Sequence, residues 1–275
     1  YLGADPAVLD PLAVDGTRTL MHSEVPDPLP APGTTEARAV YDTPKTLHWG
    51  SHIAAYMVTK AIAAGALLGA ALGLAPVALG WVSLVFTVIT VLLLIGDLKR
   101  PERFLYLITM PNTKSWLVRG GWILTAHGAL SLPFAFGFGH KALALPSVLV
   151  AFATAVYTAF LFRQARGREL WCEDRLLPLV LGVQAGAAMS ALGWFFGEWS
   201  MIWMAAYFAV TFLTVFVPLP TAGARQAHAL MLKHPAFGFG LALAFVAIFF
   251  PPAVFLAFIC LDWIYIKAGQ EVPLS

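Results

Sequence analysis

Four residues at the start of the first apolar run carry groups that could handle protons: His48, His52, Tyr56 and Lys60. They recur every four positions, so a helix would place them on one face, in a row about 18 Å long. Titratable groups at membrane depth are costly and usually functional. The alternative is two interfacial histidines, an interface tyrosine and a lysine that snorkels to the surface. Lys60 weighs against this alternative, because it lies too far into the run to reach the surface easily.

A second group of such residues surrounds the loop after the second apolar run. Asp97 ends that run, Arg100 and Arg103 follow it, and Trp116 and Arg119 open the next run. We expect these side chains to form the mouth of a site or to dock a partner. The alternative is an interfacial segment whose arginines contact lipid headgroups and whose tryptophan belongs to an aromatic belt.

Single polar residues also interrupt the later apolar runs. His127 and Tyr157 are examples, and each alone is more often a helix–helix hydrogen bond than a site. Asp262 is an exception, because a carboxylate in hydrocarbon needs a cationic partner or a proton. Lys60 is the candidate partner. We expect a proton path that includes Lys60, Asp97, Asp262 and His127.

Long apolar runs must position these residues, and several exceed the ~18 residues that cross a bilayer. The chain has 275 residues and is 59% apolar and 12% charged, which is about half the charged fraction of a soluble domain. We expect an all-α integral membrane protein, with an extramembrane proline-rich arm over 1–45 and a membrane domain over 46–275. Eight transmembrane helices are expected at 49–74, 77–96, 116–138, 145–164, 176–196, 200–218, 234–250 and 252–268.

Eight spans place both termini on the same side of the membrane, called side A here. Basic residues in the arm, in the loops and at the ends of the spans collect on side A at Arg18, Arg38, Lys45, Lys99, Arg100, Arg103, Lys114, Arg119, Arg163, Arg166, Arg168, Arg175, Arg225, Lys233 and Lys267. Side B has only Lys141. The positive-inside rule therefore predicts that side A is the cytoplasmic face of the membrane. The net charge of +2 gives no signal for nucleic acid.

The histidines and cysteines do not suggest a metal centre in this chain. Cys172 and Cys260 are far apart and form no CxxC pattern, so we expect no iron–sulfur cluster or zinc site. A bis-histidine haem needs two histidines at similar depth, whereas His52 lies near side A and His127 lies deep in its run. Any redox cofactor should therefore be diffusible.

Four segments resemble the NrfD family, the membrane subunits of polysulfide-reductase-type molybdoenzyme complexes. They are GDLKRPERFLYLITMPNTKSWLVRGGW, AVYTAFLFRQARGRELWCED, TAGARQAHALMLKHP and YIKAGQEVPLS. The first is similar to the family's DLGRPERF…PN…SWL.RG.W signature, with Lys99 where a glycine is usual. Together the segments cover nearly all of 46–275.

The resemblance implies two four-helix bundles and a menaquinone or ubiquinone site near side A. It also implies a ferredoxin-like [4Fe-4S] subunit and a molybdopterin-type catalytic subunit as partners. The family's quinone contacts carry over to His52 or Tyr56, with His48 on the same face, and to Tyr157. Trp171, in the LW pair of the second segment, joins the expected docking or mouth residues. Lys60 departs from the family's usual apolar first span.

The start of the chain, YLGADPAVLDPLAVDG, is similar to the C-terminal tail of the family's iron–sulfur subunits. This similarity indicates the membrane half of a fusion, or a piece traced separately, and no signal-peptide pattern is visible. In several relatives the catalytic partner lies outside the cytoplasmic membrane, on the quinone side. The charge count favours a cytoplasmic side A instead, so both orientations stay open.

The function we predict is a quinone-reactive membrane anchor of a respiratory oxidoreductase complex. It would exchange electrons between an iron–sulfur partner and membrane quinone, with the catalytic centre in a partner subunit. Whether protons also cross the membrane is left open. The alternative is a secondary transporter or proton channel that uses Lys60 and Asp262.

Overall fold

The computed structural model describes residues 50–97, 111–165 and 168–271. All of them belong to one compact unit of the chain, residues 37–275. Every regular element within them is a helix, so the expected all-α class is confirmed. His48, Arg100 and Arg103 lie outside the described residues, as does the side chain of Asp97.

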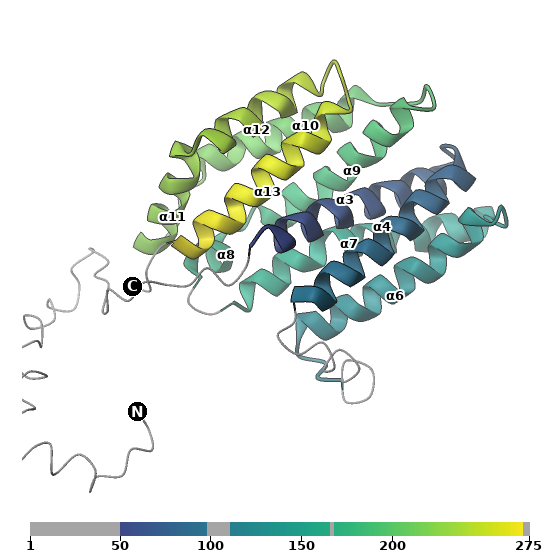
Figure 1. Ribbon diagram of the computed structural model, residues 1–275, viewed down its shortest axis with the longest axis horizontal. Coiled ribbons are helices and arrows are strands. Elements are labelled where there is room, and N and C mark those ends of the chain that lie inside the picture. Colours follow the sequence, from purple (N-terminus) through teal and green to yellow (C-terminus); the bar gives the residue numbers. More distant parts are fainter. Residues whose placement is uncertain (1–49, 98–110, 166–167, 272–275) are drawn as a thin grey trace, which may run out of the picture. The chain divides into compact units, whose positions relative to one another are not determined.

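Most of the described helices coincide with the expected apolar runs, whereas α8 and α11 lie between them. Figure 1 shows their arrangement. In chain order they are α3 (Ser51–Leu72), α4 (Pro76–Asp97), α6 (Trp116–Ala135), η2 (Lys141–Leu143), α7 (Ala144–Arg163), α8 (Glu169–Glu173), α9 (Leu177–Trp194), α10 (Met201–Leu213), η3 (Thr214–Phe216), α11 (Ala222–Lys233), α12 (Pro235–Val246) and α13 (Ala253–Glu271).

Glycine and proline set the ends of several helices. The first long helix, α3, ends at Gly73, whose φ of 91° is readily adopted only by a residue without a Cβ. The next helix begins at Pro76, where a missing N–H costs nothing because the first turn has no intrahelical acceptor for it. Thus α3 and α4 form a tight antiparallel hairpin, and the two helices are in extensive contact.

Five helices of the described residues are long and apolar enough to cross a membrane: α3, α4, α7 with η2, α9 and α13. The pair α11 and α12 makes a sixth if it is one broken span, bent by 67°. Although α10 with η3 is apolar, it is shorter, and α6 is not among the five. The multi-pass membrane class therefore holds, whereas the expected eight spans exceed this number.

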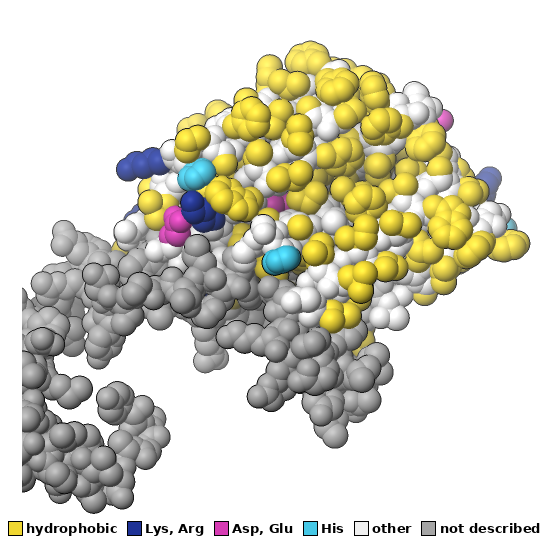
Figure 2. Space-filling model, viewed as in Figure 1, with side chains coloured by type: hydrophobic (Ala, Val, Ile, Leu, Met, Phe, Trp, Pro, Cys, Tyr) yellow, Lys and Arg dark blue, Asp and Glu magenta, His cyan; other side chains and the backbone are white. Residues whose placement is uncertain are grey.

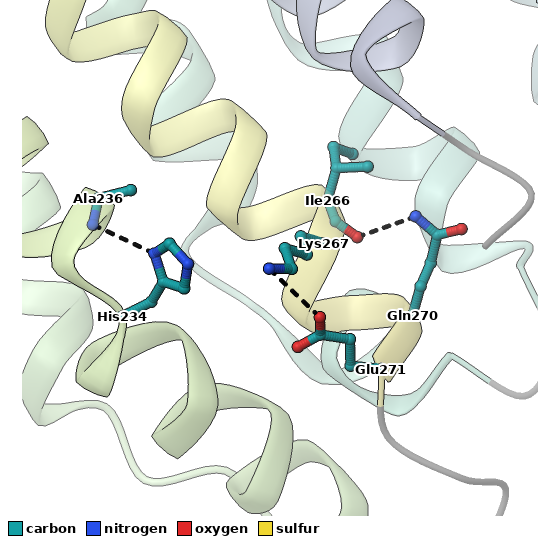
Figure 3. A network of polar contacts seen from close by, with 6 residues as sticks. All are labelled: His234, Ala236, Ile266, Lys267, Gln270 and Glu271. Atoms are coloured by element: carbon teal, nitrogen blue, oxygen red, sulfur yellow. Dashed lines mark hydrogen bonds and ion pairs between the residues drawn. The ribbon is translucent and has the colours of Figure 1, made fainter.

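The bend between α11 and α12 lies at His234 and Pro235. Pro235 cannot donate a backbone hydrogen bond to the preceding turn, so α11 ends before it. The side chain of His234 then accepts a hydrogen bond from the amide of Ala236 at 3.1 Å and caps α12 (Figure 3). Beside this cap, Lys267 of α13 pairs with Glu271 at 3.5 Å.

The most enclosed of the five apolar helices is α3, which contacts α4, α7, α9 and α13. Its close approach to α9 depends on Gly65. A Cβ at Gly65 would lie 2.5 Å from the amide nitrogen of Met189 and 2.7 Å from the carbonyl oxygen of Ala185. Small residues let helix backbones pack closely in membranes, where no hydrophobic force pulls helices together. The glycine therefore sets the distance between these two helices.

Large apolar side chains cover the outer faces of the helices. Figure 2 shows these apolar side chains over the face of the molecule that it displays. The charged side chains on this face lie mostly near the helix ends. On α4 the exposed set includes Trp81, Val85, Val88 and Leu92. An exposed apolar stripe of this length is unfavourable in water and favourable against lipid chains.

Candidate functional site

Two tyrosines, a threonine and a lysine form a buried polar cluster between α3 and α7. The hydroxyls of Tyr56 and Tyr157 are hydrogen-bonded to each other, and the Tyr56 hydroxyl also lies 3.3 Å from Oγ1 of Thr158. The ammonium of Lys60 donates to the carbonyl oxygen of Ala155 at 2.8 Å and to Oγ1 of Thr158. Tyr56, Lys60 and Tyr157 are each about 1% exposed. The cluster is therefore a continuous hydrogen-bonded chain shielded from solvent.

Helix geometry brings these groups together. Tyr56 and Lys60 are one turn apart on α3, and Tyr157 and Thr158 are adjacent on α7. The ring of Tyr157 lies directly over Gly120 of α6, where any Cβ would overlap it. Lys60 Nζ lies 5.1 Å from the centre of the Tyr157 ring. The electron-rich ring face stabilises the ammonium where water cannot.

Asp262 lies on α13, a helix that packs against α3. Its carboxylate accepts a hydrogen bond from Nε2 of Gln184 on α9 at 2.9 Å. Lys60 and Asp262 form no direct ion pair within 4 Å, although both are described, but their opposite charges attract one another. In a low-dielectric interior such an attraction acts well beyond contact distance. The predicted partnership of the two residues is thus electrostatic rather than a salt bridge.

His127 belongs to a different polar cluster. Its Nε2 lies 2.9 Å from Oγ of Ser83, and its Nδ1 lies 3.0 Å from Oγ1 of Thr154. Ser131 bonds to Ser83 at 2.8 Å. Thr154 precedes Thr158 by one turn of α7, so this cluster lies one turn farther from the start of α3 than Lys60 does. Both ring nitrogens of His127 are engaged, which leaves neither for a metal.

Replacing His127 with leucine is expected to lower the apparent stability by about 1–3 kcal/mol, because Thr154 and Ser83 lose a buried partner. The measurement is thermal unfolding of the detergent-solubilised protein. Thr125→Ala is the matched control, since Thr125 is exposed on the same helix. Equal midpoints for the histidine and threonine variants would contradict a structural role for the His127 cluster.

The remaining predicted residues lie apart from the Tyr56–Lys60 cluster. His52 is exposed in the first turn of α3, one turn before Tyr56. Arg119 is exposed, donates to the carbonyl oxygen of Thr113 at 2.8 Å, and stacks over the Trp116 ring at 4.9 Å. Trp116 itself is half-buried against Phe160. These contacts fit an entrance on the side where α3 begins, but no described contact links them to the cluster.

Trp171 is an interior residue. It is 1% exposed, stacks on Phe162 with ring centres 5.1 Å apart, and its Nε1 donates to the carbonyl oxygen of Tyr265 at 3.5 Å. The Trp171 ring also occupies the space that a side chain at Gly269 would need. Its observed contacts therefore tie α8 to α13.

Two residues of the site were not singled out from the sequence as functional: Thr158 and Gln184. Thr158 connects Lys60 to Tyr56, and Gln184 holds the carboxylate of Asp262. Threonine and glutamine within apolar helices are common helix–helix contacts, so their residue types carry little information. The only indication in the sequence was their position: Thr158 follows Tyr157, and Gln184 lies near the middle of α9.

The fold and site define a multi-pass, all-helical membrane protein with proton-capable groups buried at the centre of its helices. Residues 39–144 match the family NrfD, polysulphide reductase, which supports the NrfD resemblance found in the sequence motifs. The match includes the predicted site residues of α3, the loop before α6, and α6 itself. No curated protein matches the chain. Among the residues that the structure describes, no three His, Cys, Asp or Glu side chains are grouped to hold a metal.

Proposed function

We propose that this chain is the quinone-reactive membrane subunit of an oxidoreductase complex. The observation that carries the proposal is the buried chain from Tyr56 and Tyr157 through Thr158 to Lys60, which begins one turn behind the exposed His52. NrfD proteins are quinone-reactive membrane subunits as a class, and the family match covers α3. Reduction of a quinone takes up protons, and a hydrogen-bonded chain next to an exposed imidazole would supply them.

Each residue has a distinct proposed role. Menaquinone or ubiquinone, when bound, supplies two-electron, two-proton redox chemistry. His52 would hydrogen-bond a quinone oxygen at the start of α3, where it is accessible. Tyr56 and Tyr157 would pass protons between that position and Lys60, since their hydroxyls are already hydrogen-bonded. Asp262 would restore the proton of Lys60, and Asp97 and His127 are further candidates for the path.

We propose the eight-span architecture of two bundles as the arrangement in the membrane. The contacts α3–α4, α4–α6, α6–α7 and α7–α3 close one ring of four helices. The contacts α9–α10, α10–α12, α12–α13 and α13–α9 close a second. In this proposal α6 and α10 are spans stabilised by their neighbours, and α11 is interfacial. Both termini then lie on side A.

The proposed partners dock on side A. They are a ferredoxin-like [4Fe-4S] subunit, which exchanges electrons with the quinone, and a molybdopterin-type catalytic subunit. Trp116 and Arg119, with Arg100 and Arg103, are the proposed docking or entrance residues, and Trp171 would support them from within. Residues 1–45 would form an extramembrane arm related to an iron–sulfur subunit's tail, and 46–275 the domain in the prokaryotic cytoplasmic membrane.

Replacing His52 with alanine tests the quinone role directly. Quinone-linked turnover of the intact complex is expected to fall by about 10²-fold or more, because a hydrogen-bonding and proton-transferring group is lost. Activity with an artificial dye that bypasses the membrane subunit should persist. Thr113→Ala is a control near the same membrane face, because only the backbone of Thr113 makes a described contact. Unchanged quinone-linked turnover would remove His52 from the site.

The alternative function is a secondary transporter or proton channel. Its distinguishing feature would be a pair of broken helices in matching halves of the chain. The α11–α12 bend is one such break, and no matching break lies among the other described helices. Transport by the purified chain alone would favour this function, and copurification with iron–sulfur and molybdopterin subunits would favour the first.

A further inference from the structure

A cavity of about 60 Å³ lies within the half of the protein formed by α8 to α13. Most of its wall is apolar, and α9, α11 and α13 contribute Leu177, Leu181, Met231 and Leu261. It reaches α3 at Met57, three residues before Lys60 on the same helix. Because residues three apart lie on one helix face, the inner wall of the cavity is one turn from Lys60.

The cavity has an open end and a closed end. Asp174, Thr214 and His228 are partly exposed and line the open end, which faces the same side as the start of α9. Asp262, Tyr207 and Thr211 line the closed end and are buried. The cavity therefore connects titratable groups near the surface with the buried carboxylate that attracts Lys60.

Two hydroxyls along the cavity make only poorly formed hydrogen bonds. The hydroxyl of Tyr265 interacts with the carboxylate of Asp174, and the hydroxyl of Thr211 interacts with that of Tyr207. Neither contact has the distance and angle of a well-formed hydrogen bond. Buried polar groups are usually well satisfied, and water commonly completes the hydrogen bonding of such groups.

We infer that this cavity is a water-filled inlet that carries protons from the side-A surface to Asp262 and from there to Lys60. The inference rests on the proposed quinone function, because it supplies the protons that quinone reduction consumes. Each quinone that accepts two electrons from the iron–sulfur partner takes up two protons to become quinol. Lys60 gives up a proton through Thr158 to Tyr56 and Tyr157. The Asp262 carboxylate takes a proton from cavity water and returns it to Lys60 by way of water.

Asp174 suits the entrance of such an inlet. Burial raises the pKa of Asp174 above its ordinary value, and the amides of Leu176 and Leu177 partly oppose this by donating to Oδ1. A carboxyl group with a raised pKa can release and recover a proton closer to neutral pH. His228 stands opposite it at the same end of the cavity.

The dimensions favour water over an apolar ligand. A water molecule needs only about 10–15 Å³ of cavity volume, so a cavity of about 60 Å³ holds several water molecules. A lipid or quinone tail would leave the hydroxyls of Thr211 and Tyr265 with only their poorly formed hydrogen bonds, whereas water can complete them. The polar groups at both ends also match a water chain better than a tail.

Cysteine accessibility tests the water directly and does not depend on quinone. In membranes containing the full complex, with Cys172 and Cys260 replaced by serine, Thr211→Cys is treated with a small cationic methanethiosulfonate. We expect labelling of Thr211→Cys and of Thr214→Cys at the entrance, and none of Ser131→Cys, which is buried away from the cavity. Failure to label Thr211→Cys, or labelling only by an apolar alkyl maleimide, would overturn the hydrated inlet in favour of a dry or lipid-filled cavity.

A plugging variant then tests whether the water carries protons. Val180→Phe fills the cavity from α9 without removing a titratable group, and Leu179→Phe adds the same ring on the lipid-facing side of the same helix. We expect Val180→Phe to slow quinone-linked turnover by about tenfold with dye-linked activity retained, and Leu179→Phe to change neither. Asp174→Asn should slow turnover in the same way if the plugged variant does not assemble. Normal turnover in Val180→Phe or in Asp174→Asn would disprove the inlet, whereas the His52→Ala result decides the quinone role separately.

Discussion

Replacing Lys60 with methionine is expected to lower quinone-linked turnover by about 10²–10⁴-fold, the range over which positioned acids and bases contribute to catalysis. Methionine keeps most of the volume of the lysine stem but cannot donate to Thr158 or to the carbonyl oxygen of Ala155. The hydrogen-bonded chain from Tyr56 and Tyr157 through Thr158, which is the proposed proton relay, would then end at an apolar group. Asp262 would also lose the positive charge that attracts it.

The measurement compares quinone-linked with dye-linked activity in the purified complex. Thr59→Val is the neighbouring control on α3, because the Thr59 hydroxyl bonds to Thr90 and to the backbone carbonyl of Tyr56, but to none of the side chains of the cluster. Dye-linked activity should remain in both variants, since the catalytic partner is untouched. If Lys60→Met complexes assemble and keep normal quinone turnover, Lys60 is a structural cation and the proposed relay is wrong.

Replacing Gly65 with alanine is expected to destabilise the membrane domain by about 1–3 kcal/mol, the usual cost of forcing extra atoms into a packed interface. The added Cβ would meet backbone atoms of α9, at Met189 and Ala185, and backbone cannot rotate away as a side chain can. The two helices would have to separate. Because Lys60 lies on α3 and Gln184 on α9, the same displacement would also loosen the site.

Thermal unfolding in detergent and the yield of assembled protein measure this effect. Gly238→Ala in α12 is the matched control, because nothing lies within 4 Å of a Cβ at that position. That substitution should be neutral or slightly stabilising, since alanine is the better helix former. A Gly65→Ala protein as stable as the Gly238→Ala protein would show that α3 and α9 do not pack as closely as described.

The sequence was sufficient to predict the helices and much of the site's composition. Apolar runs ended by glycine and proline predicted α3 and α4 to within three residues at each end, because these signals are local. The four-residue spacing placed Tyr56 and Lys60 on one face of α3. The resemblance to NrfD is supported by the family match over residues 39–144. Hydropathy was less decisive for α6 and α10, where polar residues or short length weaken the signal.

Only the tertiary structure shows that the polar residues in the row on α3 differ in their exposure to solvent. His52 is exposed, whereas Tyr56 and Lys60 are enclosed by α7 and α9. Helix periodicity specifies which residues share a face, but not which helix covers that face. Here the cover depends on two glycines: Gly65, where the backbones of α3 and α9 approach closely, and Gly120, which leaves room for the ring of Tyr157.

By itself, then, the sequence determined the class of protein, the positions of its helices and the face on which proton-capable groups lie. Only the tertiary structure decided that Tyr157 meets Tyr56, that Thr158 joins Lys60 to them, and that a cavity leads to Asp262. The physical reason is that these interactions act over different distances along the chain. Hydropathy and helix propensity act along the chain, whereas hydrogen bonds between spans and the space between helices depend on shape matching between distant segments.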